Sequence, residues 1–163
     1  MKRLCSVCAR GGSKGVPNKN IRPLLGKPLL IHSLDQARES GLFDCIVVSS
    51  DSEGILQLAR DWGVDHAIER PAELATDTAA KLPVIQHCFR ATENLSEVTF
   101  DTVVDLDATS PLRNQDDLKG TVELLESHEQ IANVITGAPA RRSPYFNLVE
   151  LDESGRVLLS GLE

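Results

Sequence analysis

A glycine-rich segment near the N-terminus holds the residues best suited to chemistry. It reads Arg10-Gly-Gly-Ser-Lys-Gly-Val-Pro-Asn-Lys-Asn20. Glycines let backbone amides approach a ligand closely, and Arg10, Lys14 and Lys19 supply positive charge that can follow a chain of phosphates. The segment has no GxGxxG pattern, and Ser13 precedes Lys14, the reverse of the order in a Walker A loop. We interpret it as a phosphate-binding loop of another type; the alternative is a turn that only connects a strand to a helix.

A pair of carboxylates forms a second candidate site. Asp105 and Asp107 are two residues apart at the end of an apolar run, so on a strand they share one face and could hold a divalent metal. The alternative for Asp105 is an ion pair or hydrogen bond at the end of the sheet. Asp107 also opens a polar loop, Asp107-Ala-Thr-Ser-Pro-Leu-Arg113.

Positive charge is concentrated in the N-terminal part of the chain. Residues 1–34 carry seven basic side chains and no acidic one, although the net charge of the chain is −7. A chain with a pI of about 5.1 and 4% aromatic residues lacks the broad basic face and stacking surfaces that bind nucleic acid. The charge pattern therefore favours a small, highly charged anion as partner; the alternative is a solvated basic terminus.

Composition and apolar runs indicate one compact α/β domain over residues 1–163. The chain is 41% hydrophobic, and strand-like and helix-like segments alternate along it. This alternation predicts a three-layer fold with a mainly parallel sheet, in which ligands bind at the carboxyl ends of the strands. Strands are expected over 2–9, 45–50, 64–68, 102–106 and 131–137, helices over 28–40, 52–63, 78–92 and from 114, and a hairpin over 146–159. Leu82, Ile85 and Phe89 are expected to face inward from the third helix. Asp51 is expected to cap the helix that follows it, and Asn114 to cap the last helix with Asp117 in its first turn.

The cysteines and the apolar runs also bear on location. No run approaches the ~20 residues that span a bilayer, and no signal-peptide core is present, so we expect no membrane partner and a cytoplasmic protein. Cys5 and Cys8 have CxxC spacing, but on a strand they point to opposite faces, and no second ligand pair follows. We therefore expect reduced, buried cysteines in preference to a metal or redox pair.

Several segments resemble the acylneuraminate cytidylyltransferases, which include the CMP-sialic acid synthetases and relatives acting on other nonulosonic acids. The match begins with residues 8–22 and continues in order through 26–29, 47–51, 70–78 and 109–113. The resemblance implies a Rossmann-like nucleotidyltransferase fold. It also implies an enzyme that transfers CMP from CTP to the anomeric hydroxyl of an acidic nine-carbon sugar, releases pyrophosphate, uses Mg²⁺ and forms a homodimer.

The resemblance further assigns roles to individual residues. Catalytic roles fall on Arg10, Lys19 and Asp107. The implied nucleotide-binding residues are Arg10, Gly12, Ser13, Lys14, Lys19, Asn20, Arg70, Asp77, Thr78 and Lys81. The implied sugar-binding residues are Asp107, Thr109, Ser110 and Arg113, with Arg141 and Arg142 as weaker candidates. The Arg113 guanidinium could pair with the sugar carboxylate.

Two departures from the family pattern leave alternatives open. Sialic acid enzymes usually have Gln-Pro-Thr-Ser-Pro where this chain has Asp107-Ala-Thr-Ser-Pro111, so Asp107 could bind Mg²⁺, accept the sugar's proton or select a different nonulosonic acid. The family's paired metal-binding aspartates lie downstream of residue 163, so we expect a chain shortened at its C-terminus. The alternatives are a CTP-binding protein without catalysis and a cytidylyltransferase for the eight-carbon sugar Kdo, which the absence of a Gly-Asp-Glu-Pro loop disfavours.

Overall fold

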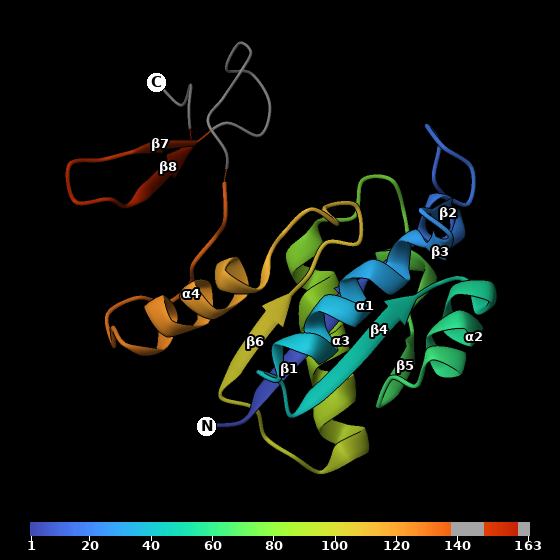
Figure 1. Ribbon diagram of the computed structural model, residues 1–163, viewed down its shortest axis with the longest axis horizontal. Coiled ribbons are helices and arrows are strands. Elements are labelled where there is room, and N and C mark those ends of the chain that lie inside the picture. Colours follow the sequence, from blue (N-terminus) through green and yellow to red (C-terminus); the bar gives the residue numbers. More distant parts are fainter. Residues whose placement is uncertain (138–148, 160–163) are drawn as a thin grey trace. The chain divides into compact units, whose positions relative to one another are not determined.

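The computed structural model describes residues 1–137 and 149–159, and the chain divides into two compact units, Met1–Glu123 and Leu124–Glu163. The first unit is built on four parallel strands: β1 (Arg3–Cys8), β4 (Cys45–Ser50), β5 (His66–Glu69) and β6 (Thr102–Asp105). Their order in the sheet is β5-β4-β1-β6 (Figure 1). The chain therefore builds outward from β1 to one side and then returns to its other side to add β6.

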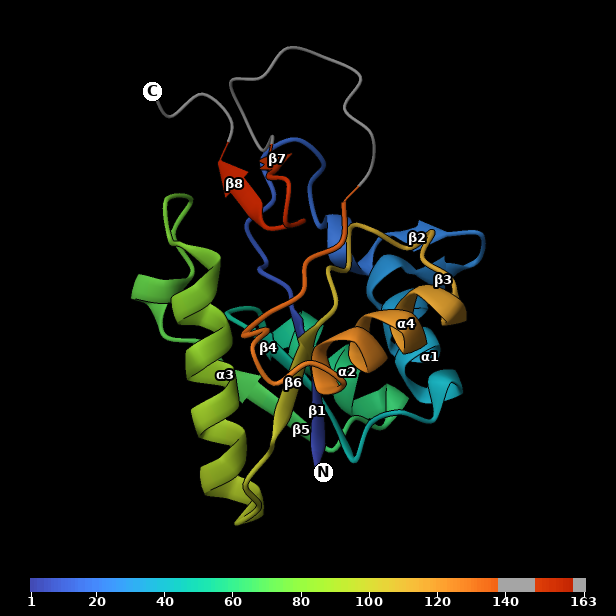
Figure 2. The ribbon, with the colours of Figure 1, turned by 90° about the vertical axis from the view of Figure 1, so that its left-hand side faces the viewer.

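Helices cover both faces of this sheet, as Figure 2 shows. They are α1 (Leu29–Ser40), α2 (Glu53–Trp62), α3 (Lys81–Ser96) and α4 (Gln115–Glu126), with short 3₁₀ turns η1 (Lys19–Ile21) and η2 (Ala72–Leu74). Side chains alternate along the strands, so Val48 of β4 packs toward α1 and α2 while Val47 packs toward Cys88 of α3. Leu118 of α4 joins the first of these clusters. The predicted three-layer, Rossmann-like α/β fold is confirmed.

Two local expectations are wrong. Helix α3 begins at Lys81 and runs to Ser96, and its buried stripe is Val84, Cys88 and Thr92. Leu82, expected to point inward, is 62% exposed because it lies in the first turn and off this stripe. The segment 131–137, expected to be a strand, forms none, because its apolar residues find no neighbouring strand in the described part of the chain.

Two hairpins complete the described residues. In the first unit, β2 (Pro23–Leu24) and β3 (Lys27–Pro28) are joined by Leu25 and Gly26, both with positive φ, as a tight two-residue turn requires. This hairpin was not predicted. In the second unit, β7 (Val149–Leu151) pairs with β8 (Val157–Leu159), which confirms the expected hairpin where it is described. Among the described residues, no helix is long and apolar enough to cross a membrane.

The start of α4 is fixed by a reciprocal cap that the sequence predicted. Asn114 Oδ1 accepts from Asp117 N at 2.8 Å, and Asp117 Oδ2 accepts from Asn114 N at 3.0 Å. We expect Asn114→Ala to lower the free energy of unfolding by about 1 kcal/mol, because it leaves the backbone N–H of Asp117 without this partner. Urea denaturation measures the loss, and Asn114→Ser, which keeps a capping oxygen, should restore most of it. Equal stability of the Ala variant and the parent chain would contradict the assigned cap.

Candidate functional site

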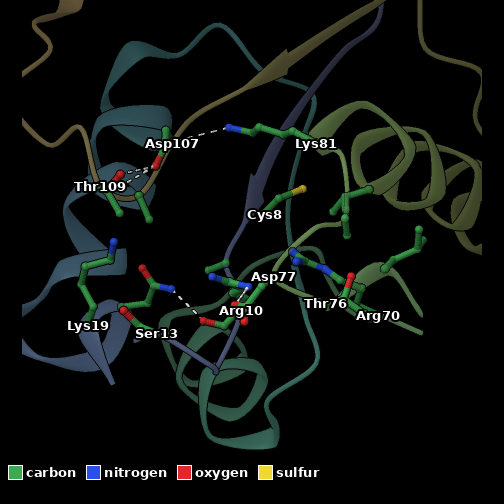
Figure 3. Close-up of a pocket in the computed structure, with 16 residues that line it drawn as sticks. Cys8, Arg10, Ser13, Lys19, Arg70, Thr76, Asp77, Lys81, Asp107 and Thr109 are labelled. Carbon is green, nitrogen blue, oxygen red and sulfur yellow. Dashed lines mark hydrogen bonds and ion pairs between the residues drawn. The ribbon is translucent and has the colours of Figure 1, made fainter. Parts of the chain in front are cut away.

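A cavity of about 310 Å³ lies at the carboxyl ends of β1 and β6, next to the start of α3 (Figure 3). This is the place in the sheet where the strand order reverses, and ligands of open α/β sheets bind at such points. The sequence-predicted residues that line it are Arg10, Ser13, Lys19, Asn20, Arg70, Asp77, Lys81, Asp107 and Thr109. Gly12, Lys14, Thr78, Ser110 and Arg113 are not among the lining residues.

The loop after β1 is fastened to the end of β4. The Ala9 backbone N–H donates to the Ser49 carbonyl oxygen at 3.0 Å, and that of Gly11 donates to Asp51 Oδ1 at 2.9 Å. A Cβ at Gly11 would lie 2.8 Å from the Ser52 Cβ, so the close approach requires glycine. Asp51, expected to cap α2, instead holds this loop, while Ser52 occupies the N-cap position without a side-chain capping bond.

Asp77 pairs with two cations of the glycine-rich loop, Arg10, which lines the cavity, and Lys14, which does not. Its Oδ1 lies 2.7 Å from Arg10 Nη1, and its Oδ2 pairs with Lys14 Nζ. Hydrogen bonds from Lys14 and Arg10 hold the pKa of Asp77 below its ordinary value. These two ion pairs therefore connect the loop that contains Asp77 to the glycine-rich loop. In this arrangement Lys14 faces Asp77 and solvent, with 79% of its side chain exposed.

Two further cations line the cavity without a carboxylate partner among the described residues. Lys19 is half-buried and takes part in no ion pair there. Arg70 is 7% exposed, and it donates from Nη2 to the Ser49 carbonyl at 2.8 Å and from Nε to Ser49 Oγ at 3.3 Å. Burying a charge is costly unless it is paired, so a cation held among neutral acceptors indicates a site for an anionic ligand.

Asn20 lines the same cavity and has one buried amide atom without a partner in the part of the chain that the structure describes. The residue is 7% exposed, and its Nδ2 donates to the Arg10 carbonyl oxygen at 3.0 Å. The Oδ1 atom is buried and has no partner in residues 1–137 or 149–159. Because buried polar atoms in native proteins are nearly always hydrogen-bonded, this oxygen fits a donor group on a ligand, such as a hydroxyl or an amine.

Of the two candidate carboxylates, Asp107 lines the cavity and Asp105 does not, but both lie close to Lys81, which lines it. Lys81 Nζ lies 2.7 Å from Asp105 Oδ2 and 3.5 Å from Asp107 Oδ2, and Figure 3 shows Lys81 and Asp107 directed toward one another. Burial alone would raise the pKa of Asp107, but hydrogen bonds from Thr109 and the Lys81 ammonium outweigh it and lower that pKa. Burial alone would lower the pKa of Lys81, but Asp105 and Asp107 outweigh it and raise that pKa. Both groups are therefore charged at neutral pH.

Arg113 lies outside the cavity lining. Its Nη1 donates to Ser33 Oγ at 3.0 Å and Gln36 Oε1 at 2.8 Å, and its Nη2 donates to the Asp107 carbonyl oxygen at 2.6 Å. These bonds fasten the loop after β6 to α1. The sugar contact predicted for Arg113 stays a prediction, since here the guanidinium holds the loop that carries Asp107. Arg141 and Arg142 lie outside the described residues.

Some lining residues were given no role from the sequence. They are Cys8, Ala9, Leu74, Thr76, Val84 and Ala108. The first four lie in segments 8–22 and 70–78, and the resemblance of these segments to the family was the available signal for them. The four cysteines are free, with Cys5 and Cys8 in the clusters on opposite faces of the sheet, as predicted. No group of three or more His, Cys, Asp or Glu residues among the described residues is arranged to hold a metal ion.

The fold and the cavity define an α/β protein with cationic side chains gathered at the topological switch point. The chain belongs to the cytidylyltransferase family, whose sequence model matches residues 4–151. It is 46% identical over 157 residues to the post-translational flagellin modification protein B of Campylobacter coli, covering 96% of this chain and 66% of that protein. It is 44% identical over 151 residues to the CMP-N,N'-diacetyllegionaminic acid synthase of Campylobacter jejuni, covering 93% of this chain and 64% of that enzyme.

A solved structure shares the fold. CMP:2-keto-3-deoxy-manno-octonic acid synthetase, in a complex with CTP, superposes with a TM-score of 0.63 at 20% identity, covering 78% of this chain and 48% of that one. At this identity the similarity supports the architecture alone. The chain thus spans about two thirds or less of the length of the proteins it matches.

Proposed function

We propose that this chain binds CTP in the cavity at the switch point of the sheet. We further propose that it acts as a cytidylyltransferase, which transfers CMP to a nonulosonic acid and releases pyrophosphate. The observation that carries the proposal is a set of four cations that line one cavity: Arg10 and Lys19 from the glycine-rich loop, Arg70 after β5, and Lys81 at the start of α3. Family membership supports the cytidylyl group, and the relative named as a legionaminic acid synthase supports an acidic nine-carbon acceptor.

The reaction explains why the site needs fixed positive charge. The anomeric hydroxyl of the sugar loses its proton to water and attacks the α-phosphorus of CTP. The bond from the α-phosphorus to the bridging oxygen breaks, and pyrophosphate leaves with added negative charge. Arg10 and Lys19 would stabilise this charge, since preorganised cations act most strongly where charge develops in the transition state. Arg70 and Asn20, both buried, would fix the nucleotide by hydrogen bonds.

The carboxylate end of the cavity fits Mg²⁺. Magnesium takes oxygen ligands and is usually held by one or two carboxylates together with substrate phosphates. Asp105 Oδ2 and Asp107 Oδ2 converge on one cationic group, the Lys81 ammonium, so the pair would hold the metal. Bound there, Mg²⁺ would supply charge neutralisation at the phosphates. The lowered pKa of Asp107 suits a metal ligand better than a general base, which needs a pKa near the working pH.

Nucleotide-dependent thermal stability tests the proposal. The chain is heated with CTP, UTP, ATP or GTP, each with and without Mg²⁺. A ligand at about a hundred times its dissociation constant adds roughly 2.7 kcal/mol, so CTP should raise the melting temperature by several degrees and the others less. Absence of any shift with CTP would overturn the site. Pyrophosphate release with CTP and a legionaminic or sialic acid then separates the enzyme from the alternative, a CTP-binding protein without turnover.

The proposal extends to a homodimer in the cytoplasm. Hairpin β7–β8 exposes Val149, Leu151, Val157 and Leu158, and an isolated two-stranded hairpin is marginally stable in water, so contacts with a second copy would stabilise it. Four free cysteines suit a reducing compartment. Light scattering at micromolar concentration tests the dimer, and a monomeric mass would refute it for this chain.

A further inference from the structure

Asp105 and Asp107 each direct one carboxylate oxygen to Lys81, and the other oxygen of each accepts a hydrogen bond from a neighbouring residue. Asp105 Oδ1 accepts from Ser6 Oγ at 3.0 Å, while its Oδ2 lies 2.7 Å from Lys81 Nζ. Asp107 Oδ1 accepts from the Thr109 backbone N–H at 2.8 Å and hydroxyl at 2.7 Å, while its Oδ2 lies 3.5 Å from the same ammonium. Both remaining oxygens thus serve one cation.

The Lys81 side chain is placed so that its ammonium can move away from the two carboxylates. Lys81 is the first residue of α3, and half of its side chain is exposed, whereas the Asp105 side chain is only 10% exposed. Asp105 therefore needs a cation beside it, since an unpaired buried carboxylate is strongly disfavoured. A divalent cation at the same two oxygens can replace the Lys81 ammonium, because Asp105 then still has a positive charge beside it.

We infer that Lys81 is a positioning residue for a divalent cation that binds the Asp105 and Asp107 oxygens. In the absence of nucleotide the Lys81 ammonium holds these two oxygens and competes with the cation for them. The inference rests on the proposed function. Lys81 opposes metal binding in the nucleotide-free chain, because ammonium and metal need the same two atoms. When the cation arrives with the triphosphate, Lys81 leaves the carboxylates, and its three N–H donors become available to phosphate oxygens in the cavity that it already lines.

The coupling follows from charge. Without nucleotide, a divalent cation must displace the Lys81 ammonium from the two carboxylates that pair with it. With nucleotide, the displaced ammonium meets the negative charge of the triphosphate, so the exchange costs less. Metal binding at Asp105 and Asp107 thereby depends on the nucleotide, and Lys81 is the residue that imposes this dependence.

Mn²⁺ binding to the full chain without nucleotide tests the inference. Free Mn²⁺ is measured by electron paramagnetic resonance for the parent chain, Lys81→Gln, Lys81→Met and Lys81→Arg. We expect Lys81→Gln and Lys81→Met to bind Mn²⁺ roughly tenfold more tightly or better, because a like charge next to the site is removed. Lys81→Arg keeps the charge and should stay close to the parent. Lys119→Gln, on the exposed face of α4, is the matched control and should change nothing.

Two results would overturn the inference. One is equal or absent Mn²⁺ binding in the parent chain and both neutral variants, each shown by its melting temperature to be folded. The other is a gain in affinity that survives in Asp105→Asn/Lys81→Gln, since the gain would then come from another site. The CTP-induced shift of the parent chain is measured in parallel, so a chain that binds CTP without the Mn²⁺ effect refutes this inference alone. A chain that fails to bind CTP refutes the proposed function.

Discussion

Arg70→Met is expected to weaken CTP binding by about 2–5 kcal/mol, or roughly thirtyfold or more, while leaving the fold at least as stable as that of the parent chain. Arg70 is 7% exposed and lines the cavity, so in the complex its guanidinium would become one partner of a buried, hydrogen-bonded pair with the ligand. Truncating one partner of such a pair is among the most costly changes at a binding site.

The stability of the variant follows from what Arg70 contacts without ligand. Its Nη2 donates to the Ser49 carbonyl, but that oxygen also accepts from Ala9 N, so it keeps a partner in the variant. Methionine fills much of the same space and carries no charge to desolvate. We therefore expect the free energy of unfolding to stay within about 1 kcal/mol of the parent or to rise.

Calorimetric titration with CTP and urea denaturation give the two quantities. Arg90→Met, an exposed arginine on α3, is the matched control and should change neither. A variant that loses several kcal/mol of stability would show that Arg70 mainly supports the fold. Unchanged CTP affinity in a stable variant would remove Arg70 from the site.

The sheet could be predicted from sequence because its strands are short apolar runs that end at glycine or polar residues. Val47 and Val48 face opposite helical layers, and a strand buried on both faces has this composition. The same reasoning failed at 131–137, where Val134 and Ile135 suggest a strand but no neighbouring strand pairs with them among the described residues. Strand formation depends on a partner, which a local pattern does not contain.

The location of the site could be predicted from the sequence, because its residues lie in loops at the carboxyl ends of predicted strands. Arg10, Lys19 and Asp107 reach one cavity because β1 and β6 are neighbours in the sheet. The direction in which each side chain points could not be predicted from the sequence. Arg113 and Lys14 share loops with lining residues, yet one bonds to Ser33 and the other to Asp77, because each finds a closer protein partner.

The cations of the glycine-rich loop therefore differ in whether they form an ion pair in the chain without ligand. Arg10 and Lys14 both contact Asp77, so substituting either also removes one of the two cations that pair with this carboxylate beside the cavity. Lys19 lines the cavity, and the structure gives it no ion pair within the described residues. An effect of Lys19 on binding can for this reason be attributed to its own contact with the ligand.

Lys19→Ala should accordingly lower CTP affinity by about 1.5–3 kcal/mol, or roughly ten- to 150-fold, the usual contribution of a hydrogen bond to a charged group. The melting temperature without ligand should stay at the parent value, since the ammonium makes no ion pair within residues 1–137 and 149–159 that the substitution could remove. The loss should shrink as salt rises, because the interaction is between charges at a half-exposed site. Lys119→Ala is the matched control. Equal CTP affinity in the two variants would place the triphosphate away from the loop after β1, and the proposed site would have to be abandoned.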